Sequence, residues 1–282
     1  MRSLRQQMID IMEIKQLSEN TQQAYLRTLI SLAKYCGRSP DKLMASDIQQ
    51  YQLYLIKERH LATSSCRLQI QAIRFFYRHV LDRPEFAFKL HYPKKEQKIP
   101  DLLTRSEALR IVSFPENLKH KMLLRTCYGC GLRVSEVVAL RVKDIDGERR
   151  LLRVEQGKGR KDRLIPLSDT LLTQLRDYWQ LYRTRDSLFV SDMTRQALHI
   201  TTVQSVYKTA KKRLGITKRG GIHGLRHAYA THQLESGLPI YLLQRWLGHA
   251  DLHSTMRYIH WVPNYQSDGH GAKDLLAEVG EL

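Results

Sequence analysis

The stretch LLRVEQGKGRKDRLIPL, residues 151–167, decides the fold class. Two short apolar runs, residues 151–155 and 163–167, flank a turn segment that contains Gly157 and Gly159. This arrangement predicts a β-hairpin. The sequence shows no second strand signal, so we expect a mainly α-helical protein with one small β-sheet.

Upstream of the hairpin, the first ninety or so residues have apolar side chains at helical spacing. One helix is predicted over residues 17–35, with Ser18 and Asn20 as capping candidates and Gly37 after its end. A second is predicted to start at Ser46, in a capping box completed by Gln49. A third helix is predicted over residues 63–81, with an apolar side that includes Leu68. Its polar side carries Arg67, Arg74 and Arg78, which are available to contact a partner.

A proline-bounded, lysine-rich segment interrupts the helical pattern at residues 93–100. Its low apolar content predicts a linker. We therefore expect a helical domain over residues 1–92, a second domain over 101–262 and a separate tail over 263–282. The tail carries four acidic residues and one lysine, with leucines at helical spacing, which favours contact with protein over contact with DNA.

Beyond the linker, Thr104 and Glu107 form a second predicted capping box. Past residue 169 the pattern is helical again and is broken at glycines. The second domain is therefore expected to be a mixed α/β domain in which helices predominate.

The charge balance points to a polyanion as partner. Lys and Arg number 46 against 28 Asp and Glu, a formal net charge of +18. Residues 1–92 and 101–282 are both basic, at +6 and +10, as expected if both domains contact one DNA duplex. With no long apolar run and no signal peptide at the N-terminus, we expect a cytoplasmic protein without a membrane partner.

A series of basic and histidine motifs follows in the second domain: GLRVSE (131–136), GKG (157–159), HGLRH (223–227), LGH (247–249) and Tyr258. Two arginines, a lysine and two histidines suit a phosphoryl group in transesterification, because they donate hydrogen bonds and most are positively charged. No phosphate loop or HExxH motif is present, so nucleotide-driven and zinc-protease chemistry are unsupported.

Roles follow from the residue types. Arg133 and Arg226 are expected to bind the two non-bridging phosphate oxygens, since a guanidinium matches their geometry. Tyr258 is the predicted nucleophile, His223 the predicted general base and Lys158 the predicted acid for the departing 5′ oxygen. The intermediate would be a 3′-phosphotyrosyl bond, and no cofactor, ATP or metal is expected.

The ordered set Arg133, Lys158, His223, Arg226, His249 and Tyr258 resembles the tyrosine recombinase family of phage integrases and Xer proteins. The resemblance spans essentially the whole chain and implies a helical core-binding domain beside the catalytic domain. It further implies a homotetramer acting on two specific double-stranded DNA sites through a Holliday junction, with the tail docked on a neighbouring protomer. Glu136 stands where the family carries an acidic residue that orients a basic partner.

DNA contacts are further expected from Arg67, Arg74, Arg78, Lys94, Lys95, Arg160 and Lys161. Two other functions remain open: a type IB-like topoisomerase, and an accessory protein that binds DNA without cutting it. Integrase, dimer-resolution and transposon roles, with or without accessory proteins, are also left open.

Several conspicuous residues are given structural roles. Cys127 and Cys130 are expected to fill small core positions, because no second CxxC accompanies them. His227 and His232 are expected to pack beside the site or to contact backbone. Trp246 is expected in the core, and Tyr265, seven residues after Tyr258, is the competing nucleophile that we disfavour.

Overall fold

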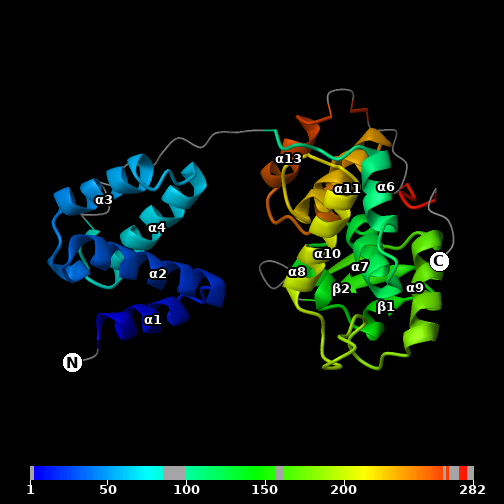
Figure 1. The fold of residues 1–282 in the computed structure, drawn as a ribbon, viewed down its shortest axis with the longest axis horizontal. Helices are drawn as coiled ribbons and strands as arrows, with labels where there is room; N and C mark the ends of the chain where they lie inside the picture. The colour runs from blue at the N-terminus through cyan, green and yellow to red at the C-terminus, as the bar shows by residue number, and fades with distance from the viewer. Residues whose placement is uncertain (1–2, 85–98, 156–161, 263–264, 267–272, 278–282) are drawn as a thin grey trace. The chain divides into compact units, whose positions relative to one another are not determined.

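The computed structural model divides the chain into two compact units, Met1–Lys98 and Ile99–Leu282 (Figure 1). It describes residues 3–84, 99–155, 162–262, 265–266 and 273–277. The division falls inside residues 93–100, the segment in which the sequence places the linker. Within these described ranges, no helix is long and apolar enough to cross a membrane.

The first unit is entirely helical in its described part. Ser18 caps α2 by accepting a hydrogen bond from the backbone N–H of Thr21, and Gly37 ends the helix with φ of 63°, as the sequence predicts. The elements are α1 (Leu4–Ile14), α2 (Glu19–Cys36), η1 (Pro40–Lys42), α3 (Ala45–Lys57) and α4 (Thr63–His79).

Two details of this unit differ from the prediction. Helix α3 begins at Ala45, because Asp47 accepts a hydrogen bond from the Met44 backbone N–H at 2.8 Å, so the box predicted from Ser46 is wrong. Leu68 is 41% exposed. It lies about 200° around the helix from Cys66 and from Ile70, which face the core.

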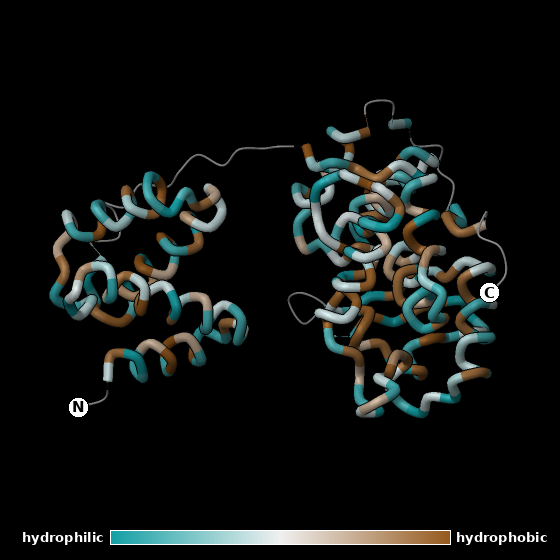
Figure 2. The backbone as a smooth tube through the Cα atoms, viewed as in Figure 1, coloured by the Kyte–Doolittle hydropathy of each residue, from teal (hydrophilic) through white to brown (hydrophobic). Residues whose placement is uncertain are grey.

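The core of the first unit is built by α2, α3 and α4, with α1 packed on α2. Apolar side chains from all four helices are buried there, and Figure 2 shows hydrophobic residues recurring along each of these helices. The largest buried members are Met8, Met12, Tyr51, Phe76 and Tyr77.

The second unit contains the predicted hairpin, now as part of a three-stranded antiparallel sheet. Strand β2 (Leu151–Val154) pairs with β3 (Arg163–Pro166), with Leu152 opposite Ile165. The additional strand β1 (Ile145–Asp146) pairs with β2. It escaped prediction because two residues are too short to show alternation. The expected class, mainly helical with a small sheet, is confirmed.

Helix α7 (Leu118–Gly129) lies at the centre of the helices of this unit. Its neighbours include α6, α9, α10 and α11. The remaining elements are α6 (Arg105–Ser113), α7 (Leu118–Gly129), α8 (Val134–Val138), η2 (Val142–Asp144), α9 (Asp169–Tyr182), α10 (Ile200–Arg213), α11 (His223–Glu235), α12 (Ile240–Leu247) and α13 (His253–Ile259).

Local details agree with the sequence analysis. The capping box at α6 is confirmed by reciprocal hydrogen bonds between Thr104 and Glu107. Cys127 and Cys130 are buried free thiols, as predicted. From the tail, Leu275 and Leu276 are buried in the core of this same unit.

Candidate active site

Five of the six predicted catalytic residues come together around the first turns of α11, which begins at His223. Arg133 precedes α8, Arg226 lies in α11, His249 follows the C-terminus of α12 and Tyr258 lies in α13. Helix α11 packs against α7, α12 and α13, which brings these distant segments to one place. Lys158 lies outside the described residues.

Arg226 is the buried centre of this cluster, at 1% exposure. Its guanidinium donates to the carbonyl oxygens of Gly131 at 2.7 Å and Leu247 at 2.6 Å. Burial and the charge of Arg133 lower its pKa to about 10, so it remains positively charged near neutral pH. The two carbonyls therefore hold the positively charged guanidinium of Arg226 in one position.

Glycine is required at position 131 by this packing. Gly131 has φ of 60°, and a Cβ there would lie 2.3 Å from the ring of Tyr229. The backbone thus turns tightly against Tyr229 and presents its carbonyl to Arg226. Arg133, two residues later, enters the site as the N-cap residue of α8.

Glu136 joins three arginines. It accepts from the backbone N–H and the guanidinium of Arg133 at 2.8 and 2.7 Å. It also accepts two hydrogen bonds from Arg163, at 2.9 and 2.7 Å, and lies 3.8 Å from Arg226. Burial alone would raise the pKa of Glu136, but hydrogen bonding and attraction to Arg163, assisted by Arg133, lower it to about 2.

His249 is held in one tautomer by its two neighbours. Arg226 can only donate, so the Nε2 atom of His249, 3.1 Å away, must accept. The ring proton is therefore on Nδ1, which donates to the Thr255 hydroxyl at 2.9 Å. Burial, together with the charges of Arg226 and Arg133, lowers the pKa of His249 to about 3, so the ring is neutral at pH 7.

Tyr258 is 1% exposed, and its hydroxyl shares a 3.1 Å hydrogen bond with Nδ1 of His227. Rings of His249 and Trp261 also flank it, with centroids 6.3 and 5.1 Å away. Burial raises the pKa of the Tyr258 phenol, while the positive charges of Arg226 and Arg257 oppose that shift. The phenol is therefore neutral in this position and surrounded by cations that would stabilise its ionised form.

His227 is the histidine that touches the predicted nucleophile. Burial and the charge of His223 lower its pKa to about 4. His223 lies one turn earlier at the surface of the site, with its ring 4.6 Å from that of His227. Partial burial and the charge of Arg226 lower the pKa of His223 as well. The motif points to His223 as the base, whereas the contact with Tyr258 is made by His227.

The other conspicuous side chains have structural partners. His232 bonds to the Leu103 carbonyl at 3.0 Å and to the Tyr128 hydroxyl. Tyr265 donates to the Leu238 carbonyl at 3.0 Å, away from the cluster. Trp246 packs partly buried against the core, and its carbonyl accepts from Arg163. Sequence reasoning missed Arg163 and gave His227 a packing role.

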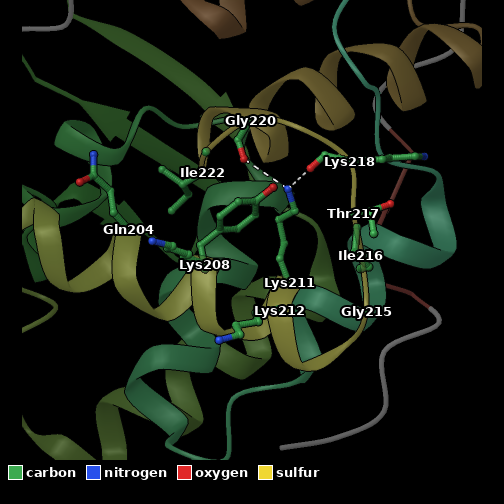
Figure 3. A pocket seen from close by; sticks show the side chains of 12 residues that line it. Gln204, Lys208, Lys211, Lys212, Gly215, Ile216, Thr217, Lys218, Gly220 and Ile222 are labelled. Carbon is green, nitrogen blue, oxygen red and sulfur yellow. Dashed lines mark hydrogen bonds between the residues drawn. The ribbon is translucent and has the colours of Figure 1, made fainter.

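Positive side chains occur on both units. On α4, Arg78 is exposed, and Arg67 and Arg74 are partly buried. Beside the site, a pocket of about 640 Å³ lies between α10 and the loop to α11, and it is lined by four lysines (Figure 3). Lys211 bonds there to the carbonyls of Lys218 and Gly220, whereas Lys208 and Lys212 are exposed. The other predicted DNA contacts, Lys94, Lys95, Arg160 and Lys161, lie outside the described residues.

Among the described residues, no group of three or more His, Cys, Asp or Glu side chains is placed to hold a metal ion. The site is instead a cluster of guanidinium groups, neutral imidazoles and a phenol, with Glu136 as the carboxylate between the arginines. Such a cluster can bind a phosphodiester and place a nucleophilic oxygen beside it.

Comparison with known proteins agrees with this geometry. Residues 97–264 match the Phage integrase family, and residues 4–85 match its N-terminal SAM-like domain. The Sinorhizobium fredii protein y4qK is 40% identical over 94% of this chain and 86% of its own length. Tyrosine recombinase XerA of Pyrococcus horikoshii is 36% identical, covering 88% of this chain and 85% of its own length.

Solved structures share the fold. A lambda integrase dimer bound to a core site superposes with a TM-score of 0.75, covering 88% of this chain and 91% of that one, at 18% identity. A crystal structure of XerA recombinase gives a TM-score of 0.54 at 27% identity, covering 91% and 92%. The chain therefore belongs to the phage integrase family and is a tyrosine site-specific recombinase.

Proposed function

We propose that Tyr258 is the nucleophile with which this recombinase cuts DNA. The phenol oxygen attacks the phosphorus of a phosphodiester, a 3′-phosphotyrosyl bond forms and the bond to the 5′ oxygen breaks. Lys158 gives its proton to that oxygen, and the phenol proton passes to an imidazole of the site, with His223 as the candidate from the motif. A 5′ hydroxyl from another strand reverses the step, and two such exchanges pass through a Holliday junction.

The observation that supports this assignment most strongly is the meeting of Arg133, Arg226 and His249 beside Tyr258. Arg226 is fixed by two carbonyls and by His249, and Arg133 is fixed by Glu136. Each arginine has donors beyond those that these contacts use, and can bind one non-bridging oxygen. As Tyr258 is buried, its side chain must move before it can reach a phosphate that lies on the arginines.

The assembly on DNA is part of the same proposal. Two protomers bind each site, and four protomers hold two sites. The side chains that contact the DNA are Arg67, Arg74, Arg78, Lys94, Lys95, Arg160 and Lys161. We expect the tail to dock on a neighbouring protomer and the enzyme to work in the cytoplasm. In the single chain Leu275 and Leu276 are buried in their own unit, so docking elsewhere requires their release.

Covalent trapping tests the nucleophile and identifies the DNA site in the same experiment. The full chain is incubated with short fragments of its source genome, denatured, and any DNA that remains attached is recovered and sequenced. Fragments with a site near one end lose the released strand and trap the adduct. Tyr258→Phe is expected to abolish adducts, whereas the matched control Tyr265→Phe is expected to retain them.

Peptide mapping of the trapped protein adds an independent readout, because the nucleotide remnant is expected on residue 258. Adducts that persist in Tyr258→Phe, or a remnant on residue 265, would overturn the assignment. A wild-type protein that never forms an adduct but still binds the fragments would favour a DNA-binding accessory role.

A further inference from the structure

Arg163 is a buried cation at a junction of three parts of the site. It is 8% exposed and stands at the start of β3. Its Nε donates to the Trp246 carbonyl at 2.7 Å, and its two terminal nitrogens donate to the two oxygens of Glu136. One side chain thus connects a strand, the carboxylate that holds Arg133, and the C-terminal end of α12.

The contact with α12 also explains a glycine of the LGH motif. Gly248 has φ of 64° and ends the helix, and a Cβ at this position would lie 2.8 Å from Cδ of Arg163. The side chain of Arg163 therefore lies directly on the turn from which His249 enters the site. A bound arginine in this place fixes the course of the turn.

Arg163 lies at the end of the hairpin that is nearest to Lys158 in the sequence. Val154 and Arg163 are the last pair of the β2–β3 ladder in the described residues. Lys158 lies in the segment that connects these two strand ends. Arg163 therefore attaches the hairpin to the rest of the site five residues after Lys158 in the sequence.

We propose that Arg163 is a positioning residue that ties the hairpin carrying Lys158 to the phosphate-binding part of the site, namely Arg133 and the turn before His249. The inference rests on the proposed function, because it concerns where the proton donor stands relative to the bound phosphate. A planar guanidinium is needed: it makes the paired contact with Glu136 and the contact with Trp246 together, and a lysine ammonium cannot match that geometry.

The test uses Arg163→Lys, which keeps the charge, with Arg153→Lys as matched control. Arg153 is on the same hairpin but 53% exposed, and it pairs at the surface with Asp162. On a DNA site recovered by the trapping experiment, Arg163→Lys is expected to slow cleavage about 10- to 100-fold, the usual loss when a supporting contact of a site is removed. DNA affinity is expected to stay within about twofold, since Arg163 is buried.

A second substrate separates positioning from general damage to the fold. When sulfur replaces the bridging 5′ oxygen, the leaving thiolate needs no proton, so misplacement of Lys158 no longer matters. The defect of Arg163→Lys is expected to shrink to a few-fold on this substrate, and the change is expected to add little in a Lys158→Ala background. Arg163→Gln, which keeps one donor for Trp246, takes its place if Arg163→Lys does not fold.

An equal defect on the oxygen and sulfur substrates, or full additivity with Lys158→Ala, would show that Arg163 does not act through Lys158 and would overturn the inference. In either case the wild-type chain still forms its adduct through Tyr258. Failure of this inference is thus distinct from failure of the proposed function, in which wild type forms no adduct.

Discussion

We expect two histidines of the site, His227 and His249, to make the second unit less stable in mild acid. The pKa of His249 is lowered to about 3 and that of His227 to about 4, from 6.5, mainly by burial and then by neighbouring positive groups. Between pH 6.5 and pH 4 the unfolded chain binds one more proton than the folded chain at each ring. A lowered folded-state pKa gives stability that is fully present above the unfolded value, so the free energy of unfolding falls as pH drops below 6.5.

The size of the effect follows from these values. At pH 5.5, protonation of each of these histidines in the unfolded chain stabilises the unfolded state by roughly 1.4 kcal/mol. Together the two lower the free energy of unfolding by about 3 kcal/mol relative to pH 8. The pKa values of His120, His223 and His232 are lowered in the same direction and increase the loss. A loss of about 3 kcal/mol is large against the roughly 5–15 kcal/mol that holds a domain folded.

Urea unfolding followed by tryptophan fluorescence measures this directly, since Trp179, Trp246 and Trp261 all lie in the second unit. Stability is measured at pH 8, 6.5 and 5.5 for wild type, His227→Asn and His249→Asn. Each substitution is expected to remove about 1.4 kcal/mol of the loss between pH 8 and 5.5, whatever it does to stability at pH 8. A wild-type stability that is unchanged at pH 5.5, or a loss that both variants retain in full, would refute the reasoning.

Three further outcomes are expected. Arg133→Ala or Arg226→Ala is expected to lower the cleavage rate, measured by adduct formation, on the order of 10²- to 10³-fold, with DNA affinity in a gel-shift assay nearly unchanged. A parallel loss of DNA affinity would mean that these arginines bind DNA and do not stabilise the transition state. Gly131→Ala destabilises the second unit by more than about 1 kcal/mol in the urea assay, because its Cβ would meet the Tyr229 ring at 2.3 Å. DNA affinity falls steeply with salt, and a flat dependence would contradict binding along the backbone.

Much of the fold was predictable because its signals are local. Capping residues, glycines and apolar spacing mark α2, α6 and the β2–β3 hairpin in the sequence, and the structure has them there. The start of α3 was misplaced because Ser46 and Asp47 both resemble cap residues, and only the contact of Asp47 with the Met44 N–H distinguishes them. Strand β1 was invisible because it depends on pairing with β2.

The site was predictable as a set of residue types, and its supporting contacts were not. In β3, Arg163 and Ile165 lie on one face and Leu164 lies on the other. A prediction from hydrophobicity alone would have placed the charged Arg163 on the exposed face. In the structure Arg163 is buried and Leu164 is 47% exposed, because Glu136 offers a charged partner on the inner face. His227 likewise gained its role only when α13 placed the Tyr258 hydroxyl beside its Nδ1. Both contacts join residues more than 25 positions apart, which no local pattern encodes.

The charges of the cluster suit the step proposed for Tyr258. Arg133, Arg163 and Arg226 carry three positive charges around Glu136, which neutralises one, while His249 and His227 are uncharged at pH 7. Two positive charges remain among these groups, and Arg257 adds another near Tyr258. A phosphodiester brings one negative charge, and attack by a phenolate creates a five-coordinate centre with two. In the proposed step the negative charge on the phosphate therefore grows as the bond to tyrosine forms, and arginines held in advance by carbonyls and a carboxylate need little rearrangement to meet it.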